Sequence, residues 1–455
     1  MRSFDLLVAL GITLSACDGD PVTPASMDSS PPDAPLPDRP GTRDVPPAVD
    51  VPPAVDVPPA IDVPPAIDVP PAIDVPPAID IPPSVDVPLP PTDVPVATDA
   101  LPVALRCGSL PYDTEALFRE SVGFGRAARG GSPTRVVHVT TTADSGAGSL
   151  RAALESDTSQ WVVFDIGASA RATITLRSTL RARSNKTIDG RGRDVVINGT
   201  VEFRSARNIV VTDVGFTNTT AERCTQDGDV LSLRGPGATR PEDFETRDIW
   251  LNHVVVFDGG DGLLDIRGGS RITVSWSRFH THEKGMLFSM ESAGAIEGRE
   301  MEVTLHHNFF DRITRRGPQV SHGRVHFFNN YQFEWWEFGA ASLVGAQFAS
   351  EANVYEARPG ATCGLPFIGC RDPNPCGDSD FEVSKIAVSN NWATSNRGYI
   401  SSVGDLLLDD ARVEVNEPAR VFRPADRYPY TAEAATPALA ARIRAESGPR
   451  TRYCR

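Results

Sequence analysis

The chain has 455 residues and a formal net charge of −15, and it is too long for one small domain. Fifteen aspartates and two arginines in residues 18–103 account for −13 of that charge, which leaves about −2 for residues 104–455. The acidic balance therefore belongs to one segment. The rest is nearly neutral, shows no sign of binding nucleic acid, and can hold an anion at a local cationic site.

The first seventeen residues, MRSFDLLVALGITLSAC, have an arginine, a short apolar run and small residues ahead of Cys17. The apolar run is too short to cross a bilayer, so residues 1–17 are interpreted as an export signal. Their ending, LSAC, resembles the lipobox of bacterial lipoproteins, in which the cysteine is lipidated and becomes the mature N-terminus. This predicts a lipid on Cys17; the alternative is an ordinary signal peptide with a chance cysteine.

Residues 18–103 repeat DVPPAV and its variants with a period of six and hold 26 of the 40 prolines. Paired prolines exclude helices and sheet ladders, and a segment without aromatic residues cannot form a core. We expect a disordered, semi-rigid stalk, followed by one domain at residues 104–455.

That domain has an even number of cysteines, which in an exported protein predicts three disulfides without fixing their pairing. Three of them share one loop, but metal binding there is the minor alternative because no histidine lies within it. The six are Cys107, Cys224, Cys363, Cys370, Cys376 and Cys454.

The domain consists of short β-type segments with one clear helix candidate, GSLRAALES at 148–156. Seven segments begin with an apolar residue, and most have a second one two positions later, as half-buried strands require. Three of their spacings are close to 23 residues, and the longer ones contain loops. The segments start at Ile209, Ile249, Ile272, Val303, Val325, Phe348 and Ile386.

The sixth position of the last four segments is asparagine, at Asn308, Asn330, Asn353 and Asn391. Two positions further on, an aromatic residue recurs in four of the segments. A coil of about 23 residues with stacked asparagines and aromatics predicts an all-β fold, a right-handed parallel β-helix. The asparagines are interpreted as structural, bonded along the stack inside a turn; a β-propeller is less compatible, because each repeat is too short for a blade. The aromatics are Phe216, Phe279, Phe310 and Tyr355.

Counting along the repeats places Asp261, Lys284 and Arg316 at the same distance, twelve or thirteen residues, from the starts of three successive segments. They are expected to form one column, with about 5 Å between neighbours. Asp265 follows on the same strand as Asp261, and the preceding repeat carries the DGD sequence of residues 227–229. Because clustered carboxylates repel one another, this grouping predicts a hard cation with oxygen ligands.

On these residues the domain resembles pectate lyases, the family that includes bacterial enzymes and plant pollen proteins. The resemblance covers about residues 120–360 and implies a parallel β-helix enzyme that cleaves polygalacturonate by β-elimination with calcium. Its motifs occur in the family's order: GFGRAARGG (123–131), VTTTADSGAGSLRAAL (139–154), SNKTIDGRG (184–192), IWLNH (249–253), DGLLDIRGGSRITVSWSRF (261–279), HEKGML (282–287), RRGP (315–318) and GRVHFFNNY (323–331).

The resemblance assigns roles residue by residue. It implies that Lys284 binds substrate and that Arg316, the first residue of an Arg-x-Pro-x-x-Arg pattern, removes the substrate proton. An electrostatic role for Arg316, with another base, stays open because arginine is normally protonated. The implied calcium ligands are Asp227, Asp229, Asp261 and Asp265.

Two positions depart from the family pattern. Where the pattern has its second arginine, this chain has Ser321, so a contact to a substrate carboxylate is in question. His322 or Arg324 are candidates to supply that contact instead. The usual aspartate of the Trp-x-Asp-His stretch is Asn252, which is interpreted as structural.

The sequence therefore predicts an exported, calcium-dependent polysaccharide lyase, held to a membrane by a lipid or secreted, and acting as a monomer. Two alternatives remain: a β-helix module that binds pectic polymer without cleaving it, and a lyase for another polyuronate, including partly methylated pectin.

Overall fold

A computed structural model describes residues 114–167, 171–221, 228–235, 246–289, 301–358, 385–389 and 397–450, all within one compact unit. The predictions for the signal, the stalk, all seven cysteines, Asp227 and Asn391 lie outside these residues. No helix of the described part is both long and apolar enough to cross a membrane.

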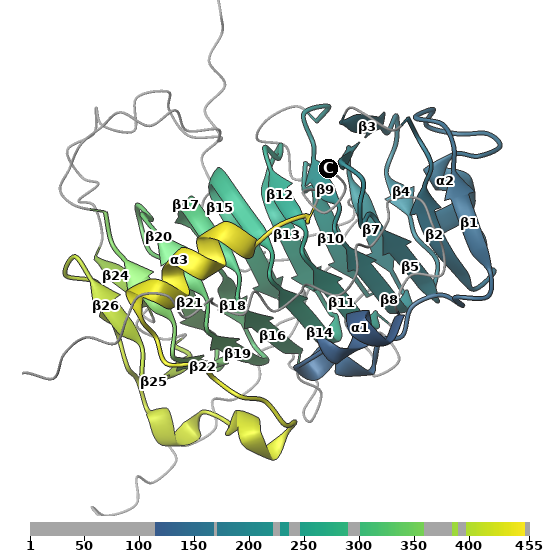
Figure 1. Cartoon of the computed structure of the whole chain (residues 1–455). Coiled ribbons are helices and arrows are strands. Elements are labelled where there is room, and N and C mark those ends of the chain that lie inside the picture. Colours follow the sequence, from purple (N-terminus) through teal and green to yellow (C-terminus); the bar gives the residue numbers. More distant parts are fainter. Residues whose placement is uncertain are drawn as a thin grey trace, which may run out of the picture. The chain divides into compact units, whose positions relative to one another are not determined.

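Parallel strands coil around one axis in successive turns, here called rungs (Figure 1). The first ladder is a ten-stranded parallel sheet. In order it contains β1 (Val136–Val139), β2 (Gln160–Phe164), β5 (Lys186–Asp189), β8 (Arg207–Thr212), β11 (Arg247–Asn252), β14 (Ser270–Ser275), β16 (Glu302–His306), β19 (Arg324–Phe328), β22 (Gln347–Glu351) and β25 (Tyr399–Val403).

A second sheet of seventeen strands divides into two ladders that share the long strand β15 (Arg278–Ser289). The second ladder is β3 (Ala172–Thr175), β6 (Val195–Asn198), β9 (Gly215–Thr217), β12 (Val255–Phe257), β15, β17 (Phe309–Arg315), β20 (Tyr331–Phe333), β23 (Val354–Glu356) and β26 (Leu406–Leu408). The third ladder is β4 (Leu180–Arg181), β7 (Val201–Arg204), β10 (Leu231–Arg234), β13 (Gly262–Arg267), β15, β18 (Gln319–Ser321), β21 (Ala340–Leu343), β24 (Ile386–Ser389) and β27 (Arg412–Val413). The protein is thus an all-β parallel β-helix, as predicted.

The helices are few and peripheral among the described residues. The predicted helix is confirmed as α2 (Leu150–Leu154), where the Ser149 hydroxyl accepts a hydrogen bond from the Ala152 amide as an N-cap. The others are α1 (Thr114–Arg119), α3 (Pro437–Glu446) and the short 3₁₀ helices η1 (Phe124–Ala127), η3 (Pro418–Arg420) and η4 (Pro424–Asp426).

Six of the seven predicted strand starts are confirmed, since the residues from Ile209 to Phe348 pair in register along the first ladder. The seventh also begins a strand, but its predicted place in this ladder was wrong. Ile386 begins β24 of the third ladder, and the residue that pairs with Phe348 is Ile400. Strands of both ladders alternate apolar and outward-facing residues, so the pattern alone does not distinguish one ladder from the other.

The asparagine stack is confirmed for the described residues and closes one corner of the coil. Asn330 Oδ1 accepts from the Asn308 amide at 3.0 Å, and Asn353 Oδ1 accepts from the Asn330 amide at 2.8 Å. Beyond Asn353 the same bond goes to Asp405 Oδ1 at 2.7 Å. The residue before each asparagine has a positive φ, 54°, 49° and 51° for His307, Asn329 and Ala352. One left-handed residue per rung turns the chain here, and the next side chain bonds to the neighbouring rung.

The predicted aromatic column also forms inside the coil. Val256, Phe279 and Phe310 pair in register, and the Phe279 and Phe310 rings stack with centroids 5.6 Å apart. Tyr355 joins the column through Gln332. These side chains are fully or almost fully buried, so each rung stabilises its neighbours through a continuous core.

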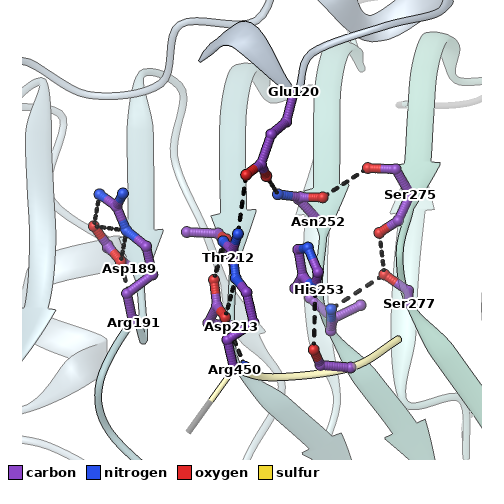
Figure 2. Close-up of polar contacts among 12 residues, drawn as sticks. Glu120, Asp189, Arg191, Thr212, Asp213, Asn252, His253, Ser275, Ser277 and Arg450 are labelled. Carbon is purple, nitrogen blue, oxygen red and sulfur yellow. Dashed lines mark hydrogen bonds and ion pairs between the residues drawn. The ribbon is translucent and has the colours of Figure 1, made fainter. Parts of the chain in front are cut away.

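The C-terminal segment ties the two ends of the described chain together (Figure 2). The Arg450 guanidinium pairs with Asp213 at 2.8 Å and with Glu120 at 3.0 Å. The other oxygen of Glu120 accepts from the buried Asn252 amide at 2.9 Å, and Asn252 Oδ1 accepts from the Ser275 hydroxyl at 2.8 Å. The side-chain amide of Asn252 donates a hydrogen bond to the Glu120 carboxylate, whereas an aspartate at position 252 would be repelled by that carboxylate. This supports the structural interpretation of Asn252.

Candidate active site

Lys284 lies where the second and third ladders meet on β15. It pairs in register with Gly262 of β13 on one side and with Arg315 of β17 on the other. Its ammonium contacts Asp261 Oδ1 at 2.5 Å, and both side chains are only partly buried. The predicted meeting of Lys284 and Asp261 is therefore present as an ion pair.

The predicted column of Asp261, Lys284 and Arg316 was wrong by one residue at both ends, because the register joins Gly262, Lys284 and Arg315. Arg316 comes after the last residue of β17 and has a φ of 62°. Its carbonyl accepts a hydrogen bond from the Met286 amide at 2.5 Å. Arg316 still lies beside the β15 rung, but in a turn and not in a strand.

Three aspartates surround Gly262 and its strand. The Gly262 amide donates to Asp229 Oδ1 at 3.0 Å, and a side chain at this glycine would start 3.0 Å from that oxygen and 3.2 Å from Asp265 Oδ1. Asp229 and Asp265 are buried, whereas Asp261 is partly exposed. Burial, together with repulsion from Asp265 and Asp261, raises the pKa of Asp229 to about 8. Burial also raises the pKa of Asp265. We call Asp229, Asp261 and Asp265 the aspartate site.

The donor set of the aspartate site fits a hard divalent cation, since such ions prefer carboxylate oxygens as ligands. Two of the carboxylates already have cationic partners: Asp261 has Lys284, and Asp265 bonds to Arg267 at 2.7 Å. Within the described ranges, no three acidic, histidine or cysteine side chains converge as a ready-made metal cluster. Asp227, the fourth predicted ligand, lies outside the described residues.

The environment of Arg316 is unusual for an arginine. Its Nε is buried and has no hydrogen-bond partner among the described residues. Burial and the neighbouring charge of Arg315 lower the pKa of Arg316, against the opposing effect of Asp265 and Asp261. The guanidinium is thus easier to deprotonate than a solvated one.

Arg315 forms an ion-pair group that the sequence analysis did not identify. Its guanidinium lies 2.8 Å from Glu283 and 3.4 Å from Glu337, and all three side chains are largely buried. Glu283 is the residue before Lys284, and Arg315 is the residue before Arg316. The ion pair between Glu283 and Arg315 therefore connects the two rungs that carry the candidate site. The only signal in the sequence was the opposite charges of HEKGML and RRGP.

The candidate replacements for the second arginine lie beyond β18. Ser321 is the last residue of that strand and pairs with Leu343 of the next rung. His322 follows with a φ of 63°, and burial lowers its pKa. Arg324 already belongs to β19 of the first ladder, where it lies 3.6 Å from Glu302. Ser321 is therefore on the ladder of the site, and Arg324 begins a strand of another.

Fold and site together define a parallel β-helix protein with a carboxylate and cation site on the outside of adjacent rungs. The chain belongs to the pectate lyase family, whose model matches residues 120–366. It is 31% identical over 277 residues to "Probable pectate lyase P56" of Solanum lycopersicum, covering 58% of this chain and 68% of that protein. It is 31% identical over 250 residues to a pectate lyase of Nicotiana tabacum, covering 52% of this chain and 62% of that one.

Solved structures share the fold. The cedar pollen allergen jun a 1 superposes with a TM-score of 0.57 at 21% identity, over 75% of this chain and 96% of that one. The pectate lyase Bsp165PelA from Bacillus sp. N165, solved with trigalacturonate, gives a TM-score of 0.53 at 19% identity, over 72% and 98% of the two chains. At these identities the likeness establishes the parallel β-helix.

Proposed function

We propose that this protein is a calcium-dependent lyase that cleaves polygalacturonate by β-elimination. The observation that carries the proposal is the aspartate site lying beside Lys284 and Arg316 on consecutive rungs, in a member of the pectate lyase family. The trigalacturonate bound in the Bacillus relative supports a polyuronate substrate.

Asp229, Asp261 and Asp265, with Asp227, would hold the calcium ion. A calcium ion held there would supply positive charge that stabilises the negative charge developing next to the substrate carboxylate as the C5 proton leaves.

In the proposed reaction, Lys284 binds the same substrate carboxylate or a neighbouring hydroxyl. Arg316, in its neutral form, takes the proton from C5, and the electron pair forms the C4–C5 double bond as the bond from C4 to the glycosidic oxygen breaks. The leaving oxygen takes up a proton from water, and protonated Arg316 returns its proton to the solvent, so the products are an unsaturated uronate end and a chain that ends in a new hydroxyl. The lowered pKa of Arg316 supports the role of a base.

A direct assay incubates the protein with polygalacturonate, with and without calcium, and follows the ultraviolet absorbance of the unsaturated product. We expect a calcium-dependent rise and a loss of about 100-fold or more in Arg316→Ala. Arg312→Ala is the matched control, since Arg312 also has a positive φ but pairs with Asp311. Binding of polymer without any rise would leave a non-catalytic binding module and exclude the lyase.

One observation favours a second substrate class. Ser321 stands in place of the pattern's second arginine and pairs in register with Leu343. Because serine is uncharged, a neutral methyl ester in the substrate would lose no ion pair at this position. Comparing rates on polygalacturonate and on partly methylated pectin tests this directly. A protein limited to the unesterified polymer would rule the second substrate out.

The organisation of the whole chain is also proposed from the sequence. A lipid on Cys17 and a disordered stalk at residues 18–103 would hold the domain at residues 104–455, a monomer with three disulfides, outside the cytoplasm. Mass spectrometry of the N-terminal peptide tests the lipid. An unmodified Cys17, or cleavage elsewhere, would contradict it.

A further inference from the structure

Gln332 is a polar residue in the aromatic column inside the coil. It pairs in register with Phe310 on one side and with Tyr355 on the other, and all three side chains are buried. Burying an amide costs free energy unless the amide is hydrogen-bonded, and the Oε1 of Gln332 has no partner among the described residues. A glutamine at this position is therefore unfavourable for packing alone, which directs attention to the bond that its nitrogen makes.

The amide nitrogen of Gln332 contacts the turn that follows Arg316. Its Nε2 donates a hydrogen bond to the Gly317 carbonyl at 3.3 Å. Gly317 is the residue after Arg316, in the turn between β17 and β18. Because Gln332 is buried in the column, it holds this turn from within the coil.

Two glycines on neighbouring rungs leave room for the Gln332 amide. A Cβ atom at Gly317 would lie 2.7 Å from Gln332 Nε2, and a Cβ atom at Gly339 would lie 2.6 Å from Gln332 Oε1. Any larger residue at either position would displace the amide. The Gly317 amide also donates to the Gly339 carbonyl at 2.7 Å. The glutamine side chain and the two glycines thus pack together across adjacent rungs.

The backbone at Arg316 depends on such support. Its φ of 62° lies in the left-handed region, which is unfavourable for a residue with a side chain and persists only where the surroundings fix it. The Arg316 carbonyl accepts from the Met286 amide of the rung before, and the next amide donates to Gly339 of the rung after. Those two bonds join backbone groups. The third bond to the turn, from Gln332, comes from a side chain that a substitution can remove.

We propose that Gln332 is a positioning residue for the lyase reaction: from within the coil it fixes the turn after Arg316 and so holds the Arg316 guanidinium in place to take the C5 proton. The proposal rests on the proposed function, since it takes Arg316 as the base. A base must lie within hydrogen-bond reach of the proton that it removes, and a displacement of about 1 Å slows a reaction strongly. Gln332 is buried and does not meet the substrate, so its loss affects proton removal and leaves substrate binding intact.

The test is Gln332→Met in the whole protein, because methionine has a similar size, suits an apolar column and lacks the amide. On polygalacturonate with calcium, kcat should fall about 10-fold to 100-fold, while KM and the melting temperature stay close to those of the parent. Hydrogen exchange at the Gly317 amide, followed by mass spectrometry, should become faster as the turn loosens. Gln160→Met is the matched control: Gln160 also has a buried Oε1 without a partner among the described residues, but it lies on β2 of the first ladder.

The outcomes separate this inference from the proposed function. A parent protein without lyase activity overturns the proposed function and the inference with it. An active parent overturns the inference alone if Gln332→Met keeps the parental kcat or the parental exchange at Gly317, or if kcat, KM and melting temperature all worsen together. Should Gln332→Met fail to fold, Gln332→Asn takes its place, since its amide is one methylene too short to reach the Gly317 carbonyl. A fall in kcat alone is expected there too, and a parental kcat overturns the inference.

Discussion

Replacing Asn330 with leucine tests how the asparagine stack holds the rungs together. The side chain is fully buried. Its Nδ2 donates to the Leu305 carbonyl at 2.9 Å and to Asn353 Oδ1 at 3.1 Å, and its Oδ1 accepts from both the amide and the Nδ2 of Asn308 at 3.0 Å. Leucine has a similar size and makes none of these bonds.

The magnitude follows from the groups left without partners. Leucine leaves the Asn308 amide buried without its partner, at about 1–3 kcal/mol, and removes the side-chain bond to the Leu305 carbonyl. Breaking the side-chain bonds to the neighbouring rungs adds to this, so we expect a loss of about 3–5 kcal/mol in the free energy of unfolding. Aspartate at the same position should recover the bonds that Oδ1 accepts but not those that Nδ2 donates, as Asp405 does at the end of the stack.

Equilibrium denaturation by urea, followed by circular dichroism, measures the change. Asn208→Ala is the control, because Asn208 also bonds to another asparagine, Asn185, but at a more exposed corner. A loss below about 1 kcal/mol for Asn330→Leu, no greater than for the control, would show that apolar stacking alone holds the rungs.

Three further predictions concern the site, the termini and pH. Lys284→Met should lower kcat/KM on polygalacturonate about 100-fold in the absorbance assay, and an unchanged value would remove Lys284 from the site. Asn252→Asp should destabilise the fold by about 1–3 kcal/mol, because it sets a carboxylate against Glu120; in denaturation experiments, Glu120→Gln should restore most of the loss. Burial lowers the pKa of both His253 and His280 to about 4, so between pH 6.5 and 4 these groups make the unfolded chain bind more protons and lower stability as the pH falls. The raised pKa of Asp229 acts in the opposite direction, so melting temperatures at pH 7 and 5 are compared in Asp229→Asn, and equal values there would contradict the prediction.

The strand register of the first ladder could be predicted from the sequence because each rung repeats one local pattern. Buried apolar residues recur at the strand starts, and the asparagine that bonds to the next rung recurs five positions later. The prediction failed at Ile386, where the long interval after Phe348 carries strands of more than one ladder.

The column of Asp261, Lys284 and Arg316 was predicted to within one residue, and the error has a structural reason. Counting residues from the strand starts of the first ladder assumes that every rung bends at the same positions. Strand β15, however, runs without a break through the second and third ladders. The contact of Arg315 with Glu283 and Glu337 could not be predicted at all, since it depends on how far long side chains reach across rungs.

A common arrangement in this fold indicates where the proposed cation would matter most. Acids that face outward from the coil are often neutralised by an arginine two residues later on the same side of the strand, as in Glu202 with Arg204 and Asp265 with Arg267. Asp229 departs from this arrangement, because the residue two positions later is the buried Leu231. Its carboxylate accepts a hydrogen bond from the Gly262 amide, and its pKa is raised to about 8. Asp229 is thus the carboxylate at which a bound cation, as proposed above, would relieve the most repulsion.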